Sequence, residues 1–154
     1  MNTRVIISSV LFFLSFPPFN FWYLIFPSLF FFYSGILLSS KPFLSGLVFG
    51  AISFGVILFG IQSIGYEAWI PLSLLMGLLY GFYGKLFKFI AVKTNNNFFI
   101  LIGIISTFDL LRAYFPFGGF PWGSTSTVLI SGYRDTSYNP VSYTHLRAHE
   151  TCPY

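Results

Sequence analysis

Asp109 and Arg112 are charged residues inside a long apolar stretch, which makes them the first candidates for chemistry. Their spacing of three residues places both side chains on one face of a helix, within reach of each other. A lone ionised side chain is costly in hydrocarbon, and pairing two opposite charges near the membrane surface removes most of that cost. We therefore interpret Asp109 and Arg112 as a structural ion pair that orients the following loop, and not as catalytic residues.

A second group of reactive side chains lies near the end of the chain and consists of His145, His149 and Cys152. Histidine nitrogen and cysteine sulfur are ligands that zinc accepts. A structural zinc site needs a fourth ligand, and no recognisable metal-binding pattern surrounds these three residues. The sequence therefore predicts no metal site and no cofactor.

Residues 115–123, with the sequence FPFGGFPWG, form the most unusual stretch of the chain. Two prolines and three glycines disfavour a regular helix, while three phenylalanines and a tryptophan disfavour a fully solvated loop. Tryptophan is enriched at the headgroup level of membranes. We predict an ordered, substrate-facing loop at the membrane surface.

The amino-acid composition of the chain indicates the class of protein to which these residues belong. The chain has 154 residues, of which 55% are hydrophobic, 23% are aromatic and only 8% are charged, and its mean hydropathy is +0.76. Soluble domains carry roughly 25% charged residues, because their surfaces face water. The composition excludes a soluble enzyme and a nucleic-acid-binding module. We therefore predict an integral membrane protein that is surrounded by membrane lipids. The net charge of +4 is then interpreted as basic residues that set the orientation of the helices in the membrane.

Prolines and polar residues divide the apolar part of the chain into five predicted helices. Residues 5–38 are too long for one crossing of about 30 Å at about 1.5 Å per residue. Pro17, Pro18 and Phe19 lie where a turn would divide this stretch into a hairpin with two short arms. Three further spans are predicted over residues 42–62, 68–92 and 98–115. The predicted fold class is an all-α membrane protein with about five transmembrane helices.

Basic residues give the predicted orientation of these helices. If the amino terminus is cytoplasmic, five basic residues fall on the cytoplasmic side, Lys85 and Lys88 near the end of the fourth predicted span and Arg4, Lys41 and Lys93 outside the spans. The opposite orientation would place all of them outside, against the positive-inside rule. The fifth helix then leaves the membrane outward, so the aromatic loop is expected on the extracytoplasmic side.

Glycines recur at a spacing of four in the third and fourth predicted helices. The two pairs are Gly46 with Gly50 and Gly77 with Gly81. This spacing lets helix backbones approach closely, although membrane helices are in general rich in glycine. The pattern indicates a packed bundle and says nothing about activity.

The last part of the chain, residues 132–154, differs in composition from the rest. It is polar, and it holds both histidines and the only cysteine. Residues 141–151, VSYTHLRAHET, resemble a peptide that recurs at the ends of unrelated sequences as translated sequencing-adapter read-through. We predict a polytopic transmembrane domain over residues 1–131 and a non-native polar tail over residues 132–154.

Three motifs, in this order along the chain, resemble the amino-terminal membrane domain of apolipoprotein N-acyltransferases. They are SFPPFN at residues 15–20, DLLRAY at residues 109–114 and the Phe-Pro-Trp run at residues 120–122. Asp109 stands where the family more often has glutamate, and Ala113 where it more often has glycine. The resemblance covers about residues 1 to 130, and the Leu-Arg run followed by Phe-Pro-Trp is its specific part.

The resemblance implies an enzyme of the bacterial inner membrane that acts at the outer face. Such an enzyme transfers an acyl chain from a phospholipid, through a cysteine thioester, to the amino group of a diacylglyceryl-cysteine lipoprotein. Its Glu-Lys-Cys triad belongs to a nitrilase-like domain that is absent from this sequence, so the chain is expected to be a fragment that is inactive alone. Cys152 is not the expected nucleophile, whereas Trp122 corresponds to a functionally important tryptophan. The resemblance implies that Phe120, Pro121 and Trp122 form the substrate-side part of the loop.

The alternative function is of a different class. The chain would then be a complete, small, non-enzymatic integral membrane protein, such as a transporter subunit or an assembly factor. A lipid-flipping or pore-forming bundle is disfavoured, because no series of ionisable residues follows a path through the predicted helices.

Overall fold

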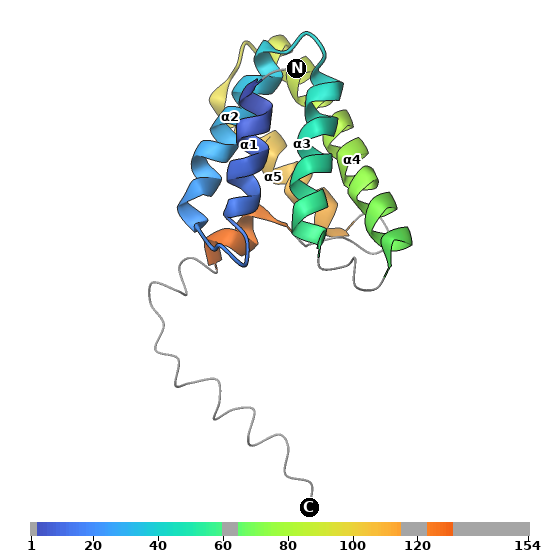
Figure 1. Cartoon of the computed structure of the whole chain (residues 1–154). Coiled ribbons are helices and arrows are strands. Elements are labelled where there is room, and N and C mark those ends of the chain that lie inside the picture. The colour runs from blue at the N-terminus through green and yellow to red at the C-terminus, as the bar shows by residue number, and fades with distance from the viewer. Residues whose placement is uncertain (1–2, 60–64, 115–122, 131–154) are drawn as a thin grey trace, which may run out of the picture.

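The computed structural model describes residues 3–59, 65–114 and 123–130, which form a helical bundle (Figure 1). The helices in these ranges are α1 Thr3–Leu14, the short 3-10 helix η1 Trp22–Leu24, α2 Ile25–Leu38, α3 Pro42–Ile57, α4 Tyr66–Lys93 and α5 Phe98–Tyr114. Residues 125–130 are also helical. No strand occurs in the described part of the chain, so the predicted all-α class is confirmed.

Successive helices run in opposite directions, which gives the bundle two distinct ends (Figure 1). The amino-terminal end holds the start of α1, the connection from α2 to α3 and the connection from α4 to α5. The distal end holds the turn after α1, the end of α3, the start of α4, the end of α5 and residues 123–130. Arg4, Lys41 and Lys93 therefore lie at the amino-terminal end of the bundle, whereas Asp109 and Arg112 lie at its distal end.

The turn between α1 and α2 lies at Pro17, Pro18 and Phe19. Proline has no backbone N–H to continue a helix, and the amides of Phe19 and Asn20 both donate to the carbonyl oxygen of Phe16 at 3.1 Å. Asn20 has a φ of 54°, a left-handed conformation that asparagine tolerates better than most residues. Because the turn and η1 occupy residues 15–24, both helical arms are shorter than the sequence predicts.

Two buried serines connect α1 to α2. Ser8 Oγ donates to the carbonyl oxygen of Ser28 at 2.9 Å, and Ser28 Oγ donates to the carbonyl oxygen of Ser8 at 2.9 Å. Both residues are fully buried. Small residues let the backbones approach, and the hydroxyl groups then find partners on the facing helix.

Replacing Ser8 and Ser28 by alanine together is expected to lower the stability of the bundle by about 1 kcal/mol, because an interhelical hydrogen bond in a membrane protein contributes about 0.6 kcal/mol on average. The matched control is the double alanine variant of Ser9 and Ser34, whose hydroxyls bond to carbonyl oxygens of their own helices. Unfolding of the purified chain in detergent measures both. Equal losses in the two double variants would contradict a role in helix pairing.

The α3–α4 contact is built on glycine. A Cβ added at Gly46 would lie 2.0 Å from the carbonyl oxygen of Tyr80, and one added at Gly50 would lie 2.7 Å from the carbonyl oxygen of Met76. From the α4 side, a Cβ at Gly81 would lie 3.1 Å from the carbonyl oxygen of Phe43. The two backbones therefore touch, which is the close approach that the glycine spacing permits.

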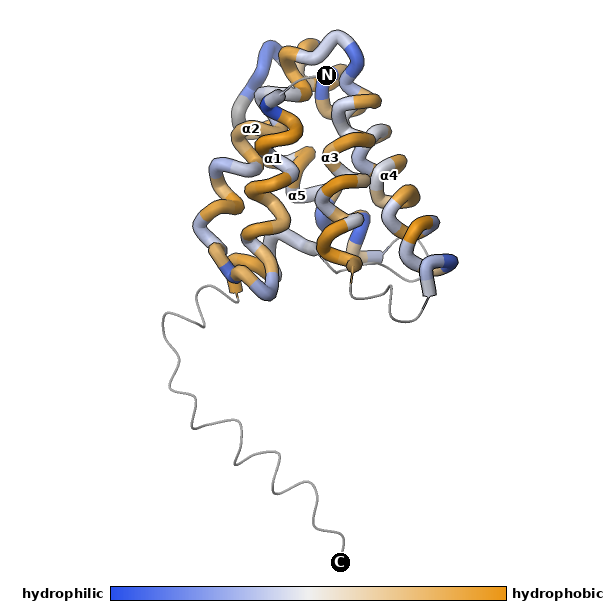
Figure 2. Tube along the Cα trace, viewed as in Figure 1, coloured by the Kyte–Doolittle hydropathy of each residue, from blue (hydrophilic) through white to orange (hydrophobic). Residues whose placement is uncertain are grey.

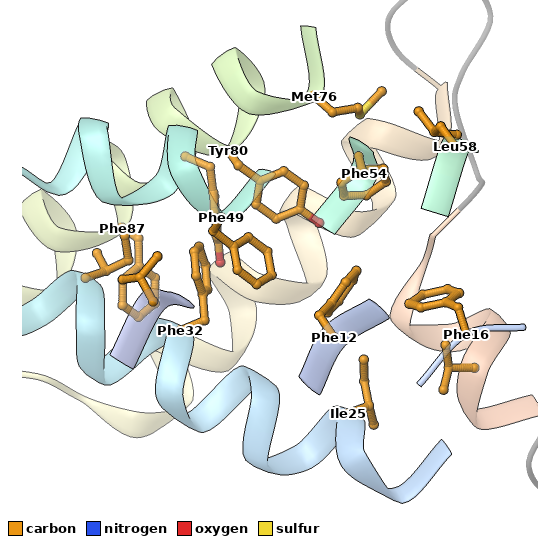
Figure 3. Packing of buried hydrophobic residues seen from close by; sticks show 14 residues of the cluster. Phe12, Phe16, Ile25, Phe32, Phe49, Phe54, Leu58, Met76, Tyr80 and Phe87 are labelled. Carbon is orange, nitrogen blue, oxygen red and sulfur yellow. The ribbon is translucent and has the colours of Figure 1, made fainter. Parts of the chain in front are cut away.

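A connected set of aromatic rings fills the centre of the bundle (Figure 3). Each helix from α1 to α5 contributes at least one ring, in order Phe12, Phe32, Phe49, Tyr80 and Phe108, the first four of which are labelled in Figure 3. Ring centroids are 5.3 Å apart for Phe12 and Phe49, 4.2 Å for Phe32 and Phe49, 5.2 Å for Phe49 and Tyr80, and 5.1 Å for Tyr80 and Phe108. The separations above 5 Å lie in the range that aromatic pairs favour, and Phe32 and Phe49 approach more closely still. Much of the unusual aromatic content is thus used inside the bundle.

Hydrophobic residues occur along every helix, as the colouring in Figure 2 shows, and many of their side chains are exposed on the outside of the bundle. Phe30, Phe82 and Phe89 each expose more than half of their surface, and apolar exposure over several helices is typical of a surface that meets lipid. In the described part, only α4 is long and apolar enough to cross a bilayer, whereas α1, α3 and residues 22–38 are apolar but shorter. The five crossings therefore stay a prediction.

Candidate functional site

The candidate site lies at the distal end, where residues 123–130 pack back against α5. Two residues of α5, Asp109 and Arg112, provide its charges. Because α5 is helical there, the spacing of three residues brings the two side chains to the same face, with Arg112 Nη2 3.4 Å from Asp109 Oδ1. The charged pair is therefore present at the end of the last described long helix.

Arg112 is the central residue of this cluster. Its side chain is only 2% exposed, and Nη2 donates to the carbonyl oxygen of Gly123 at 3.0 Å. The guanidinium carbon also lies 5.3 Å from the centroid of the Phe54 ring, within the range of a cation–π contact. One side chain thus joins α5 to α3 and to the segment that follows residue 122.

Asp109 uses both carboxylate oxygens. Oδ1 pairs with Arg112, and Oδ2 accepts a hydrogen bond from Thr125 Oγ1. The side chain is 22% exposed. A carboxylate held in this way by a cation and a hydroxyl is well suited to fixing the position of residues 123–130. The arrangement supports a positioning role, which stays a proposal.

Gly123 meets two requirements that only glycine satisfies easily. Its φ of +70° is in the left-handed region, and an added Cβ would lie 2.7 Å from Phe54 Cε1. The absence of a side chain therefore lets the backbone turn close to Phe54 and present its carbonyl oxygen to Arg112. Residues 115–122 are consequently flanked on one side by α5 and on the other by a residue bonded to α5.

Two pockets lie near this cluster. One, of about 380 Å³, has carboxylate and hydroxyl groups in its lining together with aliphatic side chains, including Asp109, Ser106, Ser124, Thr125, Ser126 and Leu129. The other is an apolar groove of about 570 Å³ between α4 and α5, lined by residues that include Leu79, Phe82, Leu86, Phe89, Phe108 and Leu111. A recess that contains a carboxylate and hydroxyl groups thus lies at the cluster, and an apolar groove extends from Leu111 toward Phe89, in the direction of the amino-terminal end.

The aromatic loop predicted from the sequence, with Phe120, Pro121 and Trp122, lies outside the described residues. Its neighbours in the chain, Tyr114 and Gly123, are both described and lie at the distal end. The role assigned to the three loop residues is therefore still a prediction.

The residues considered for a metal, His145, His149 and Cys152, also lie outside the described part. Within the described residues, no group of three or more histidine, cysteine, aspartate or glutamate side chains is placed to hold a metal ion. The site is therefore described by its protein groups alone.

Sequence reasoning did not identify Phe54, Gly123 or Thr125 as partners of the charged pair. Phe54 is one of many phenylalanines, and nothing in its neighbourhood distinguishes it. The position of Gly123 could have been inferred from the sequence, because a glycine directly after Pro-Trp marks the end of the loop at a place where the chain must turn. Thr125 lies two residues further on, and its bond to Asp109 depends on how the chain returns to α5.

Comparison with known proteins identifies relatives over most of the chain. A model of the apolipoprotein N-acyltransferase N-terminal domain matches residues 8–138. The apolipoprotein N-acyltransferase of Aquifex aeolicus (strain VF5) is 32% identical over 133 residues, covering 76% of this chain. The chain spans 27% of the length of that curated relative. No solved structure matches the chain.

Proposed function

The chain belongs to the apolipoprotein N-acyltransferase family, and from this membership we propose that its bundle is the lipid-binding membrane domain of such an acyltransferase. The enzyme would transfer an acyl chain from a phospholipid to the amino-terminal diacylglyceryl-cysteine of an apolipoprotein. The observation that carries this proposal is the family match over residues 8–138, which includes the Asp109–Arg112 cluster and the Phe-Pro-Trp run. The bundle would bind and orient lipids at its distal end.

The proposal includes five crossings of the bacterial inner membrane with a cytoplasmic amino terminus. Arg4, Lys41 and Lys93 lie at the amino-terminal end of the bundle, as the positive-inside rule requires for that end. Trp22 and Trp69 lie at the distal end, where tryptophan would mark the opposite interface. Helices shorter than the hydrocarbon core are compatible with crossing if the bilayer thins locally.

The distal cluster would support the substrate-side loop. Because Arg112 binds Gly123 and Asp109 binds Thr125, the chain after the loop is fixed to the helix before it. We place Phe120, Pro121 and Trp122 at the lip of the lipid entrance. The apolar groove between α4 and α5 is suited to an acyl chain, since its lining is almost wholly hydrocarbon.

The chemical step itself is assigned to residues beyond residue 131. Acyl transfer through a covalent intermediate needs an activated nucleophile with a base and an oxyanion stabiliser, which the family resemblance places in a nitrilase-like Glu-Lys-Cys domain. We propose that residues 132–154 do not belong to the native protein. The change in composition at residue 132 and the adapter-like residues 141–151 support this proposal, whereas the family match extends to residue 138 and so includes the first seven residues of the segment.

The test is to resequence the source gene beyond the codon of Ser131 and to express the whole reading frame in a bacterium depleted of its own apolipoprotein N-acyltransferase. Restored N-acylation of a lipoprotein, read by mass spectrometry, is the expected result. Trp122→Phe in that whole protein should lower the acylation rate by about tenfold or more through loss of substrate positioning. Trp22→Phe, at the same end of the bundle, is the matched control.

Two results would overturn this proposal. One is a native stop codon directly after Tyr154 with the tail retained, which would favour a small non-enzymatic membrane protein. The other is an extended reading frame with no Glu-Lys-Cys domain. Equal rates for the Trp122 variant and wild type would remove the loop assignment alone.

A further inference from the structure

We propose that the amino-terminal end of the bundle holds a second lipid site, a pocket for the phosphate group of an anionic phospholipid. The pocket has a volume of about 470 Å³ and is formed by the start of α1, the α2–α3 connection and the first turns of α3. It lies at the opposite end of the bundle from the Asp109–Arg112 cluster (Figure 1). Binding here is therefore distinct from binding of the acyl donor at the distal end.

The lining of this pocket has two chemical halves. Arg4 and Lys41 contribute cationic groups, and Ser39, Ser40 and Ser45 contribute hydroxyl groups. Guanidinium and ammonium groups and the hydroxyls of Ser39 and Ser40 can donate hydrogen bonds to phosphate oxygens, whereas the Ser45 hydroxyl already donates to Ser39. The other half is aliphatic and consists of Val5, Leu38, Leu44 and Val48. A phosphate joined to a glycerol ester and the first methylenes of an acyl chain matches both halves, whereas inorganic phosphate matches only one.

The α2–α3 connection is held in shape before any ligand binds. Ser45 Oγ donates to Ser39 Oγ at 2.7 Å, and the backbone amide of Lys41 donates to the same hydroxyl oxygen at 3.1 Å. Lys88 of α4 donates to the carbonyl oxygen of Ser39. The connection is thus tied to α3 and α4, so little ordering is needed when a ligand binds.

The electrostatic environment favours an anion. The two carboxylates of the described residues are Glu67, in the first turn of α4, and Asp109, near the end of α5, so both lie at the distal end. Lys85 and Lys93 add positive charge toward the amino-terminal end. Basic pockets on the cytoplasmic side of membrane helices bind anionic headgroups, and the orientation proposed above places this pocket on that side.

The experiment titrates the purified 154-residue chain, in neutral detergent, with a short-chain phosphatidylglycerol and follows binding by calorimetry. Parallel titrations use the matching phosphatidylcholine and inorganic phosphate. The test variant is the double glutamine variant of Arg4 and Lys41. The control is Lys93→Gln, matched in charge to Lys41→Gln, because Lys93 lines neither this pocket nor the apolar groove between α4 and α5. Lys41→Gln alone is a second test variant that leaves α1 unchanged.

Saturable binding of phosphatidylglycerol is expected, with a Kd raised about tenfold in the Arg4 and Lys41 double variant and little changed in the control. Lys41→Gln alone should give part of this change. Equal weakening in test and control variants would overturn the pocket in favour of general surface charge. Inorganic phosphate binding as tightly as the lipid would overturn the lipid assignment, and equal binding of phosphatidylcholine would overturn the preference for an anionic lipid. Because none of these titrations involves acyl transfer, their failure leaves the proposed enzyme function unaffected.

Discussion

Replacing Arg112 by alanine is expected to lower the free energy of unfolding of the chain by about 3 kcal/mol, since removing one partner of a buried ion pair leaves the other charge uncompensated. The variant loses the hydrogen bond to the Gly123 carbonyl oxygen, the pair with Asp109 and the contact with Phe54 together. Residues 123–130 would then be held less firmly to α5. Unfolding in detergent gives the stability, and limited proteolysis after α5 reports the loosened segment.

Two further variants separate charge from geometry in this cluster. Arg112→Lys keeps the charge but lacks the planar fork of arginine, so we expect it to recover only a minor part of the loss. Asp109→Asn made in the Arg112→Ala background should cost less than Asp109→Asn made in the wild type, because the pair is already broken. Strictly additive losses would show that the two residues act independently, contrary to the geometry described here. Lys93→Ala, which removes an exposed charge, is the control for general charge effects.

Gly46→Ala is expected to destabilise the bundle by about 3 kcal/mol, near the upper end of the range for overpacking a close contact. The added methyl group would lie 2.0 Å from the carbonyl oxygen of Tyr80. A backbone atom cannot rotate away as a side chain can, so α3 and α4 must separate along their contact. Unfolding in detergent, compared with wild type at the same detergent concentration, measures the loss.

Gly55 supplies a control on the same helix. No atom lies within 4 Å of a Cβ added at this position, and alanine has a higher helix propensity than glycine by about 1 kcal/mol. Gly55→Ala should therefore be neutral or slightly stabilising, opposite in sign to Gly46→Ala. A loss at Gly55 equal to that at Gly46 would show that glycine flexibility, and not close packing, is what α3 needs.

The sequence predicts helix positions well where polar residues mark the ends. The fourth helix was predicted over residues 68–92 and spans Tyr66–Lys93, because Glu67 and Lys93 mark its two ends. The predicted third helix extends to residue 62, whereas α3 ends at Ile57. Leu58 and Phe59 are as apolar as the helix before them, so hydropathy gives no signal for its end.

The candidate site was only partly accessible to sequence reasoning. A spacing of three on one helix is local information, so the meeting of Asp109 and Arg112 follows from helix geometry. The third partner, the Gly123 carbonyl oxygen, and the fourth, the Phe54 ring, depend on how the chain returns to α5 and on which face α3 presents. These are tertiary contacts between segments that no local pattern connects.

The chain of rings from α1 to α5 has a consequence for biogenesis. In the proposed membrane topology the helices insert in the order of synthesis, so Phe12, Phe32, Phe49 and Tyr80 reach the bilayer before Phe108 does. Phe108 contacts Tyr80 and stacks on Tyr83 with centroids 3.9 Å apart. In that order of insertion, the rings of Tyr80 and Tyr83 lack their Phe108 partner until α5 is inserted, and the bundle is open on the side that α5 closes.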